Sequence, residues 1–197
     1  MTKLVIATGN KGKLREIQHI LQPLGLDIVP QSDFNVPEAA EPHCTFVENA
    51  LAKARHASRC TGLPALADDS GICIEALGGA PGVYSAIYAG EPRSDARNNE
   101  KLQQELAKHD NRRAHFHCVM VLVRHADDTQ PLIAEGSWFG EVLTEARGDD
   151  GFGYDPYFLD PPSGKTGAEL SLEQKNLISH RGKALAVLLQ KLTDYPL

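Results

Sequence analysis

The segment ALADDSG, residues 65–71, places two adjacent carboxylates and a glycine inside what otherwise reads as a buried apolar strand. A buried ionised carboxylate is costly unless it is paired or bound to a metal, so Asp68 and Asp69 need a cationic partner or an exposed strand end. Neighbouring side chains of a strand point to opposite faces, so we expect only one of the two to enter a given cleft. We favour Asp69, next to Ser70 and Gly71, for a chemical role. The alternative is a turn in which an aspartate caps a helix or forms an Asx turn.

The composition is that of an ordinary globular chain. The 197 residues are 42% hydrophobic and 23% charged, which predicts one soluble domain over residues 1–197. The formal net charge of -6 comes without a basic stripe, so we expect no nucleic-acid partner. No stretch approaches the roughly 18 apolar residues of a membrane span, so we expect no membrane partner and a cytoplasmic location. The four cysteines lack a CxxC spacing, which favours reduced thiols over a zinc site or disulfides.

The N-terminal region predicts a strand, a glycine turn and a helix. A short apolar run at residues 4–7 is followed by TGNKGK at residues 8–13. Apolar residues at helical spacing come next: Leu14, Ile17, Leu21 and Leu24. A turn at a helix start offers backbone NH groups and the positive end of the helix dipole, where phosphates bind, and its lysines add positive charge. The glycine spacing is not that of a Walker loop, and a plain glycine turn with solvated lysines is the alternative.

A second helix is expected to begin at Phe46, after a proline-rich loop and a short strand at residues 27–29. Thr45 and Glu48 have the spacing of a capping box. Asn49 and Lys53 share a face with this helix start, because they follow Thr45 by four and eight residues. Lys53 could neutralise a phosphate or pair with one of the two adjacent aspartates, or it could be a solvated lysine.

Alternating strands and helices continue along the chain. We expect a helix over residues 95–108, a long strand over 114–123, a pair of strands at 132–134 and 138–142, and a C-terminal helix. His115 and His117 would share one face of the long strand. Two histidines in that pattern can hold a metal, but no third ligand stands at a recognisable spacing.

A glycine-rich segment at residues 149–158 contains Phe152 between two glycines. Glycines weaken any strand or helix there, so the ring is hard to explain as core filling and suits stacking on a flat base. Asp155 precedes a proline and is biased toward extended geometry. Ser171 and Gln174 form another capping box, and the polar residues Lys175, His180 and Arg181 follow, the last two just ahead of the C-terminal helix.

Seven motifs together resemble the inosine triphosphate pyrophosphatase family. They are TGNKGK at 8–13, TFVENALAKAR at 45–55, ADDSG at 67–71, GGAPGVYSA at 78–86, GFGYDP at 151–156, KTGAEL at 165–170 and SHRGKAL at 179–185. The resemblance covers essentially the whole chain in one order. It implies an α/β fold with an elongated mixed β-sheet flanked by helices, in two lobes with a central active-site cleft. It also implies a homodimeric, Mg²⁺-dependent enzyme that hydrolyses non-canonical purine nucleoside triphosphates (ITP, dITP and XTP) to the monophosphate and pyrophosphate.

The resemblance assigns roles to matching positions. Asp69 corresponds to the general base, with Lys13 and Lys53 beside it in the catalytic cluster, and the implied metal ligands are Glu41, Asp69 and Asp68. The implied substrate contacts are Thr8, Gly9, Asn10, Lys11, Gly12, Lys13, Ser70, Phe152, Gly153, Tyr154, Asp155, Lys175, His180 and Arg181.

Two departures from the family pattern stand out. Ile87 occupies the position of an arginine, and an aliphatic side chain cannot replace guanidinium donors. The usual glycine-bearing segment after Glu41 reads Pro42, His43, Cys44. Ile87 motivates one rival interpretation, a nucleotide-binding regulator without catalysis, and the retention of both Glu41 and Asp69 argues against it. A pyrophosphatase for modified pyrimidine nucleotides is a second rival, because the phosphate-binding residues do not select a base.

Overall fold

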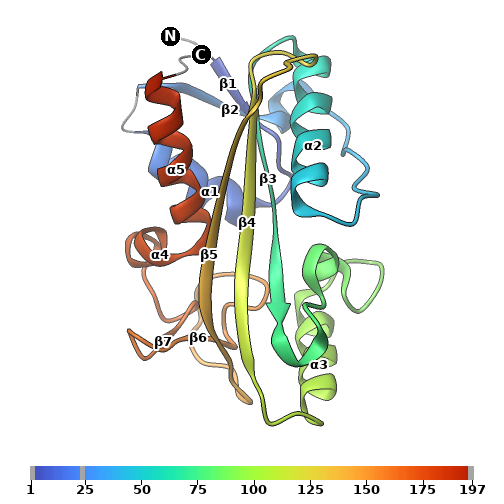
Figure 1. Cartoon of the computed structure of the whole chain (residues 1–197), viewed down its shortest axis with the longest axis vertical. Helices are drawn as coiled ribbons and strands as arrows, with labels where there is room; N and C mark the ends of the chain where they lie inside the picture. Colours follow the sequence, from blue (N-terminus) through green and yellow to red (C-terminus); the bar gives the residue numbers. More distant parts are fainter. Residues whose placement is uncertain (1–2, 23–24, 195–197) are drawn as a thin grey trace. The chain divides into compact units, whose positions relative to one another are not determined.

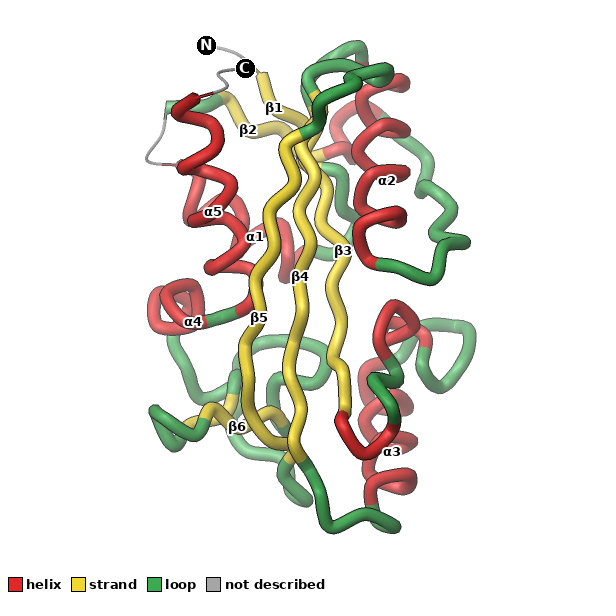
Figure 2. The backbone as a smooth tube through the Cα atoms, viewed as in Figure 1, coloured by secondary structure: helices red, strands yellow, loops and turns green. Residues whose placement is uncertain are grey.

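The computed structural model describes residues 3–22 and 25–194. Its described strands form a seven-stranded sheet in the order β2-β1-β3-β4-β5-β6-β7 (Figure 2). The strands are β1 (Lys3–Ile6), β2 (Asp27–Pro30), β3 (Ala65–Ile74), β4 (Arg113–Val123), β5 (Leu132–Val142), β6 (Phe158–Asp160) and β7 (Lys165–Thr166). The sheet is mixed, because β1 runs parallel to β2 and β3 whereas β6 runs antiparallel to β5 and β7.

Helices alternate with these strands along the chain (Figure 1). The α-helices are α1 (Lys11–Leu21), α2 (Phe46–Thr61), α3 (Asp95–Leu106), α4 (Leu172–Ile178) and α5 (His180–Asp194). Short 3-10 helices are η2 (Gln31–Phe34), η3 (Glu75–Leu77) and η4 (Gly82–Ile87). The predicted α/β fold with a mixed sheet flanked by helices is confirmed, and the two-lobed arrangement with a cleft stays a prediction.

The chain divides into two compact units. Unit 1 contains Met1–Asp69, Cys118–Gly136 and His180–Leu197, and unit 2 contains Ser70–His117 and Ser137–Ser179. Strands β3, β4 and β5 contribute residues to both units. Each unit has buried apolar clusters of its own. The chain therefore passes between the two units three times within these strands. A single folding domain over residues 1–197 stays a prediction.

The sheet in unit 1 is covered on both faces. Helices α1 and α5 lie on one face and α2 lies on the other (Figure 1). The strand residues alternate accordingly, as the period of two requires. The α1/α5 core contains Leu4, Ile6, Leu66, Met120 and Leu122 from the strands, and the α2 core contains Val5, Ala65, Ala67, Val119 and Val121.

The order of the first three strands creates a switch point at the carboxyl ends of β1 and β3. From β1 the chain passes through α1 to β2 on one side, and then through α2 to β3 on the other side. Ile6 pairs with Leu66, and the Ala7 N–H donates to the Leu66 carbonyl at 2.8 Å. In open α/β sheets ligands bind outside the strand ends at such a point. Asp68 and Asp69 are the β3 residues that extend just beyond the end of β1.

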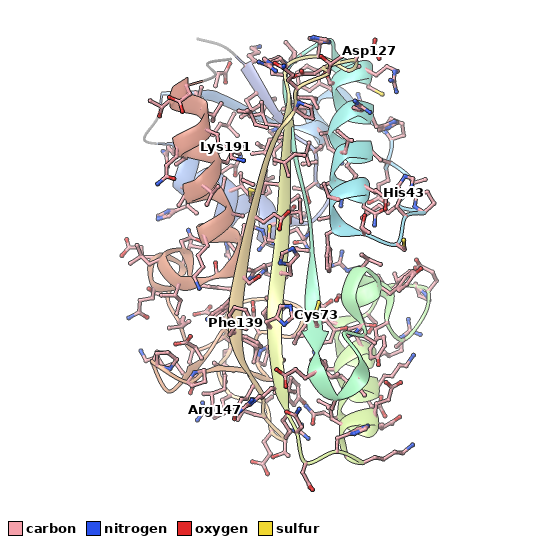
Figure 3. All side chains as sticks on the ribbon, viewed as in Figure 1. His43, Cys73, Asp127, Phe139, Arg147 and Lys191 are labelled. Carbon is pink, nitrogen blue, oxygen red and sulfur yellow. The ribbon has the colours of Figure 1, made fainter. Side chains whose placement is uncertain are left out.

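Unit 2 has an aromatic core. Trp138 of β5 and Phe116 of β4 pack on Phe158, with ring centroids 4.8 and 4.7 Å from the Phe158 ring. Leu102 and Leu106 of α3 join the same cluster. On the opposite face of β5, Phe139 is 69% exposed (Figure 3).

Strand β5 is continuous, so the prediction of two separate strands was wrong. The interruption was expected between residues 134 and 138, and Gly136 there instead lies inside the strand. A Cβ atom there would lie 2.2 Å from the His180 carbonyl oxygen and 2.6 Å from the Ala184 nitrogen. Gly136 therefore allows the start of α5 to approach the strand closely, which is a recognised use of glycine within sheets.

Other local predictions can be compared directly. The Ser171–Gln174 capping box is confirmed, with both reciprocal bonds present. At Thr45 the hydroxyl accepts from the Glu48 N–H as predicted, but it also donates to the Glu48 carboxylate. Helix α5 begins at His180 itself rather than after Arg181. Leu24 lies outside the described residues.

Two further expectations concern cysteines and histidines. All four cysteines are free thiols, as predicted. His117 Nδ1 is 2.9 Å from the Ser137 hydroxyl, and the His115 ring lies against Phe139. Over residues 3–22 and 25–194, no group of three or more His, Cys, Asp or Glu side chains is arranged to hold a metal. Within those same ranges, no helix has the length and apolar character needed to span a membrane.

Candidate active site

Asp68 points to the face of β3 that α1 and α5 cover. Its Oδ2 atom lies 3.0 Å from Lys13 Nζ and accepts from Arg181 Nη2 at 3.1 Å. Arg181 also donates to the buried carboxylate of Glu16 on α1. Burial by itself raises the pKa of Asp68, but the charges of Lys13 and Arg181 outweigh it and hold the pKa well below its usual range. This carboxylate is ionised and fully compensated.

Asp69 points to the α2 face and has weaker compensation. Its Oδ1 accepts from Lys53 Nζ at 3.0 Å and its Oδ2 from the Asn49 amide at 3.3 Å. Burial raises the pKa of Asp69 to about 6; Lys53 and Lys13 limit this rise, whereas nearby Glu41 adds to it. A carboxylate with a pKa near neutrality can exchange a proton under physiological conditions.

Lys53 lies between two carboxylates. Its Nζ atom is 2.8 Å from Glu41 and 3.0 Å from Asp69. Burial by itself lowers the pKa of Lys53, but the neighbouring carboxylates raise it above its usual value. The loop that carries Glu41 is fixed at His43, whose backbone N–H and carbonyl both bond to the Asn49 side chain beside the start of α2 (Figure 3). Two negative groups therefore share one cation here.

The turn at residues 8–13 forms the start of α1. Asn10 is the N-cap, and its side-chain oxygen accepts from the backbone N–H groups of Gly12 and Lys13 at 2.8 and 3.1 Å. The Asn10 N–H donates to the Thr8 hydroxyl at 3.2 Å. The Asn10 side chain thus occupies two of the N–H groups that a phosphate would use at a helix start. An incoming phosphate oxygen can replace it by rotation of one side chain.

A second polar cluster lies in unit 2 around Phe152. The Phe152 N–H donates to Asp155 Oδ2 at 2.9 Å, and Lys175 Nζ lies 2.6 Å from the same oxygen. Lys175 is also 4.7 Å from the centroid of the Phe152 ring. The next residue, Tyr154, is buried and donates its hydroxyl to the Ser85 carbonyl at 2.7 Å. The backbone on both sides of Phe152 is therefore fixed while its ring stays partly accessible.

Comparisons with known proteins place this geometry in a family. The model of the Ham1 family matches residues 4–191. The chain belongs to the Ham1 family. A protein of Ralstonia nicotianae named dITP/XTP pyrophosphatase is 65% identical over 195 residues, covering 98% of this chain and 97% of the relative. A protein of Nitrosomonas europaea with the same name is 63% identical over 194 residues, covering 98% and 96%.

Two solved structures agree with this assignment. The HAM1 protein of Coxiella burnetii superposes with a TM-score of 0.90 at 48% identity, covering 98% of this chain and 100% of that one. The Ham1 protein of Staphylococcus aureus has a TM-score of 0.86 at 38% identity, covering 98% and 100%. The family resemblance inferred from the seven motifs is therefore confirmed.

The Mg²⁺ that the motif resemblance implies can be tested against the donors present. Glu41 and Asp69 supply carboxylate oxygens, the ligand type that Mg²⁺ prefers, and the ion needs only one or two of them beside substrate phosphates. The Lys53 ammonium already lies between these two carboxylates, which shows that the position attracts a cation. The residues therefore fit the ion. Asp68 fits less well, because both Lys13 and Arg181 already neutralise it.

In unit 1 of this Ham1-family chain, contacts join the predicted catalytic and metal-binding residues. One group is Asp68 with Lys13 and Arg181, and the other is Asp69 with Lys53 and Glu41. Thr8, Gly9, Asn10, Lys11 and Gly12 lie beside them in the turn before α1 and at its first residues. His180 is the first residue of α5 and is buried at 4% exposure.

In unit 2, contacts join another set of predicted substrate contacts. They are Phe152, Asp155 and Lys175, with Gly153 and Tyr154 in the same turn. Ser70 belongs to unit 2 and directly follows Asp69 in β3. Ile87, which replaces the family arginine, ends η4 and is 39% exposed. The roles of all these residues stay predictions.

Sequence reasoning missed three residues that the structure ties to these clusters. Glu16 pairs with Arg181 although 165 positions separate them in the chain. The periodicity of α1 gave no reason to bury a carboxylate at that position. Asp95 and Asn99 of α3 bond to Gly153 and so to the Phe152 turn. An acidic residue in the first turn of a helix reads as a partner of the helix dipole, so Asp95 carried no separate signal.

Proposed function

We propose that this chain hydrolyses non-canonical purine nucleoside triphosphates (ITP, dITP and XTP) to the monophosphate and pyrophosphate, and so removes them from the nucleotide pool. Asp69 carries the proposal, because a carboxylate with a pKa near 6 lies at the switch point of the sheet beside a helix N-terminus and two lysines. The names of the relatives from Ralstonia nicotianae and Nitrosomonas europaea support the same reaction.

The reaction would begin with a water molecule attacking the α-phosphorus. Asp69 accepts a proton from this water as the new P–O bond forms. The bond between the α-phosphorus and the bridging oxygen breaks, and its electron pair leaves with pyrophosphate. Lys13 and Lys53 offset the negative charge of the triphosphate. Bound Mg²⁺, held by Glu41 and Asp69 with Asp68 as a further candidate ligand, would supply additional neutralisation of the phosphate oxygens.

The turn at residues 8–13 would hold phosphate oxygens. Backbone N–H groups of Gly12 and Lys13 are available once Asn10 releases them, and the dipole of α1 favours an anion at this end. Thr8, Gly9 and Lys11 complete this turn, and Ser70 would be a further substrate contact.

Phe152 would stack on the purine base. Stacking on an aromatic ring contributes about 1–3 kcal/mol per base and does not depend on base identity. Discrimination must therefore come from hydrogen bonds, and donors aimed at a 6-oxo group would leave unpaired groups against the 6-amino group of adenine. Gly153, Tyr154, Asp155, Lys175, His180 and Arg181 are the candidate contacts for this recognition.

Product identification tests the proposal directly. The purified protein is incubated with Mg²⁺ and, separately, ITP, dITP, XTP, ATP, GTP and dTTP. Release of monophosphate and pyrophosphate from the inosine and xanthine nucleotides alone is the expected result. Turnover of pyrimidine nucleotides in preference would favour the pyrimidine rival, and tight binding without turnover would favour the regulator. Release of single phosphates would overturn the mechanism.

The proposal includes a homodimer in the cytoplasm. The dimer is implied by the motif resemblance, and the cytoplasm is where the nucleotide pool lies. Light scattering at micromolar concentration should give twice the 21.4 kDa of one chain. A mass equal to one chain at all concentrations would contradict the dimer without affecting the proposed reaction.

A further inference from the structure

The turn that carries Phe152 has an unusual backbone. Gly151 and Gly153, on either side of the aromatic residue, both have positive φ angles of 80° and 62°. Within the turn, the Asp155 N–H donates to the Phe152 carbonyl at 3.2 Å and the Phe152 N–H donates to Asp155 Oδ2 at 2.9 Å. Contacts from outside the turn add to these two bonds.

Helix α3 holds this turn at both backbone polar groups of one residue, Gly153. The Gly153 N–H donates to Asp95 Oδ2 at 2.8 Å, and the Asn99 amide donates to the Gly153 carbonyl at 2.8 Å. Asp95 and Asn99 are four residues apart and so lie on one face of α3, one turn above the other. Asn99 also donates to the Asp95 carbonyl at 2.9 Å, which fixes its own side chain. Both polar groups of Gly153 are therefore bonded to one helix face.

The orientation of the Asn99 amide follows from its partners. Its nitrogen faces two carbonyl oxygens, so exchange of the nitrogen and oxygen would place acceptors against acceptors. The side chain is 92% buried, since its relative exposure is 8%. An aspartate at this position would present a carboxylate to the same carbonyls, and it could not perform this function.

Asp95 and Asn99 both act on the main chain next to Phe152, through the N–H and the carbonyl of Gly153. On the other side, the Phe152 N–H is held by Asp155. Asp95 and Asn99 with their two bonds to Gly153, the Gly153 clamp, therefore constrain the backbone that carries the ring. We propose that Asp95 and Asn99 are positioning residues that hold the backbone of Gly153 so that the Phe152 ring is placed to stack on the purine base. This inference rests on the proposed function.

Kinetics with a matched pair of variants test the proposal. Asp95→Ala removes the acceptor for the Gly153 N–H, whereas Asp95→Asn keeps an oxygen at the same position. We expect Asp95→Ala and Asn99→Ala to raise KM for ITP roughly tenfold with kcat nearly unchanged, since a base stack contributes about that much. Asp95→Asn should restore KM to within about twofold of the wild type. Unchanged KM in both alanine variants would overturn the proposal.

A base-free ligand separates positioning from general damage. Inorganic pyrophosphate as a competitive inhibitor contains no base, so its inhibition constant should be the same in wild type and both alanine variants. An equal weakening of pyrophosphate and ITP would overturn the proposal, because it would show a loss not specific to the base. Ser94→Ala is the matched control, because it removes the N-cap of the same helix without touching Gly153.

A double variant tests whether the clamp acts through the ring. In a Phe152→Ala background, Asp95→Ala should raise KM no further, because no ring remains to be positioned. A further roughly tenfold rise in that background would overturn the proposal. If the wild type releases no pyrophosphate from any nucleotide, the proposed function fails and this inference fails with it. An active wild type with insensitive variants refutes the inference alone.

Discussion

The two faces of β3 each receive one carboxylate of the segment at residues 65–71. On the α1/α5 face, Asp68 and Glu16 are two negative groups matched by two cations, Lys13 and Arg181. On the α2 face, Asp69 and Glu41 share Lys53 as the cation at ion-pair distance. The first group is balanced in formal charge, and the second carries one negative charge in excess.

This difference in balance explains the opposite pKa shifts of two neighbouring aspartates. Both are buried, so burial raises the pKa of each. Lys13 and Arg181 reverse the shift at Asp68, whereas Lys53 and Lys13 do not outweigh burial and the charge of Glu41 at Asp69. The comparison teaches that burial alone does not mark the reactive carboxylate. The reactive carboxylate is the one whose negative charge is not balanced by a cation, because such a carboxylate attracts either a proton or a metal ion.

The largest expected effect is on turnover when the excess charge is removed. Asp69→Asn keeps the shape of the side chain but cannot accept a proton from water. We expect kcat for ITP to fall by at least about 100-fold, the scale of general-base catalysis. The melting temperature should not fall, because the substitution removes the buried negative charge that is in excess on this face. Asp33→Asn, at an exposed position of the same unit, should leave the rate unchanged. A variant of Asp69 that keeps more than about a tenth of the rate would remove it from this role.

The next effect is on stability, and it arises on the balanced face. Arg181→Met leaves Asp68 and Glu16 buried with Lys13 as the remaining cation, so we expect the free energy of unfolding to fall by about 3–5 kcal/mol. Urea titration of the wild type and the variant measures this free energy of unfolding. Lys191→Met removes an exposed positive charge from the same helix and should cost less than about 1 kcal/mol (Figure 3).

A second substitution sharpens this test. Adding Glu16→Gln to Arg181→Met removes one of the two uncompensated carboxylates, so part of the lost stability should return. Equal stability of the single and double variants would show that charge balance is not what Arg181 provides. The stability of the balanced face would then have to come from packing.

The sequence predicted the local elements of unit 1 well, and the reason is physical. Thr45 and the spacing of Lys53 fix which face of α2 is polar, and alternation in β3 separates Asp68 from Asp69. The prediction that Lys53 could pair with one of these aspartates is confirmed. These features depend on residues close in sequence, where helix and strand periodicity determine direction.

Features that depend on distant residues could not be predicted in this way. The pairing of Glu16 with Arg181 and the bonds from α3 to Gly153 join residues far apart in the chain. The interruption expected between residues 134 and 138 is absent, and the sequence does not show that the backbone of α5 approaches Gly136 there. The motif resemblance placed Arg181 among the substrate contacts, whereas the structure buries its guanidinium between two carboxylates.

The smallest effect is a pH dependence of stability that distinguishes the two faces. The folded-state pKa of Asp69 is raised from 3.8 to about 6, so its contribution to stability is fully present below about pH 4 and is lost as the pH rises through 6. Asp68 has a lowered pKa, so its contribution is present above about pH 4 and is lost as the pH falls. The neutral Asn in Asp69→Asn does not titrate.

Urea unfolding with a chelator at pH 4.5 and pH 7 therefore provides the measurement for the Asp69 face. Relative to Asp69→Asn, the wild type should lose about 1–3 kcal/mol between the two conditions, following about 1.4 kcal/mol per unit of pKa shift. Added Mg²⁺ should reduce this loss, because a cation beside Asp69 favours its ionised form and lowers its pKa. Parallel pH dependences in the two proteins would mean that Asp69 is as well compensated as Asp68, and the excess charge on the α2 face would then not be the origin of its reactivity.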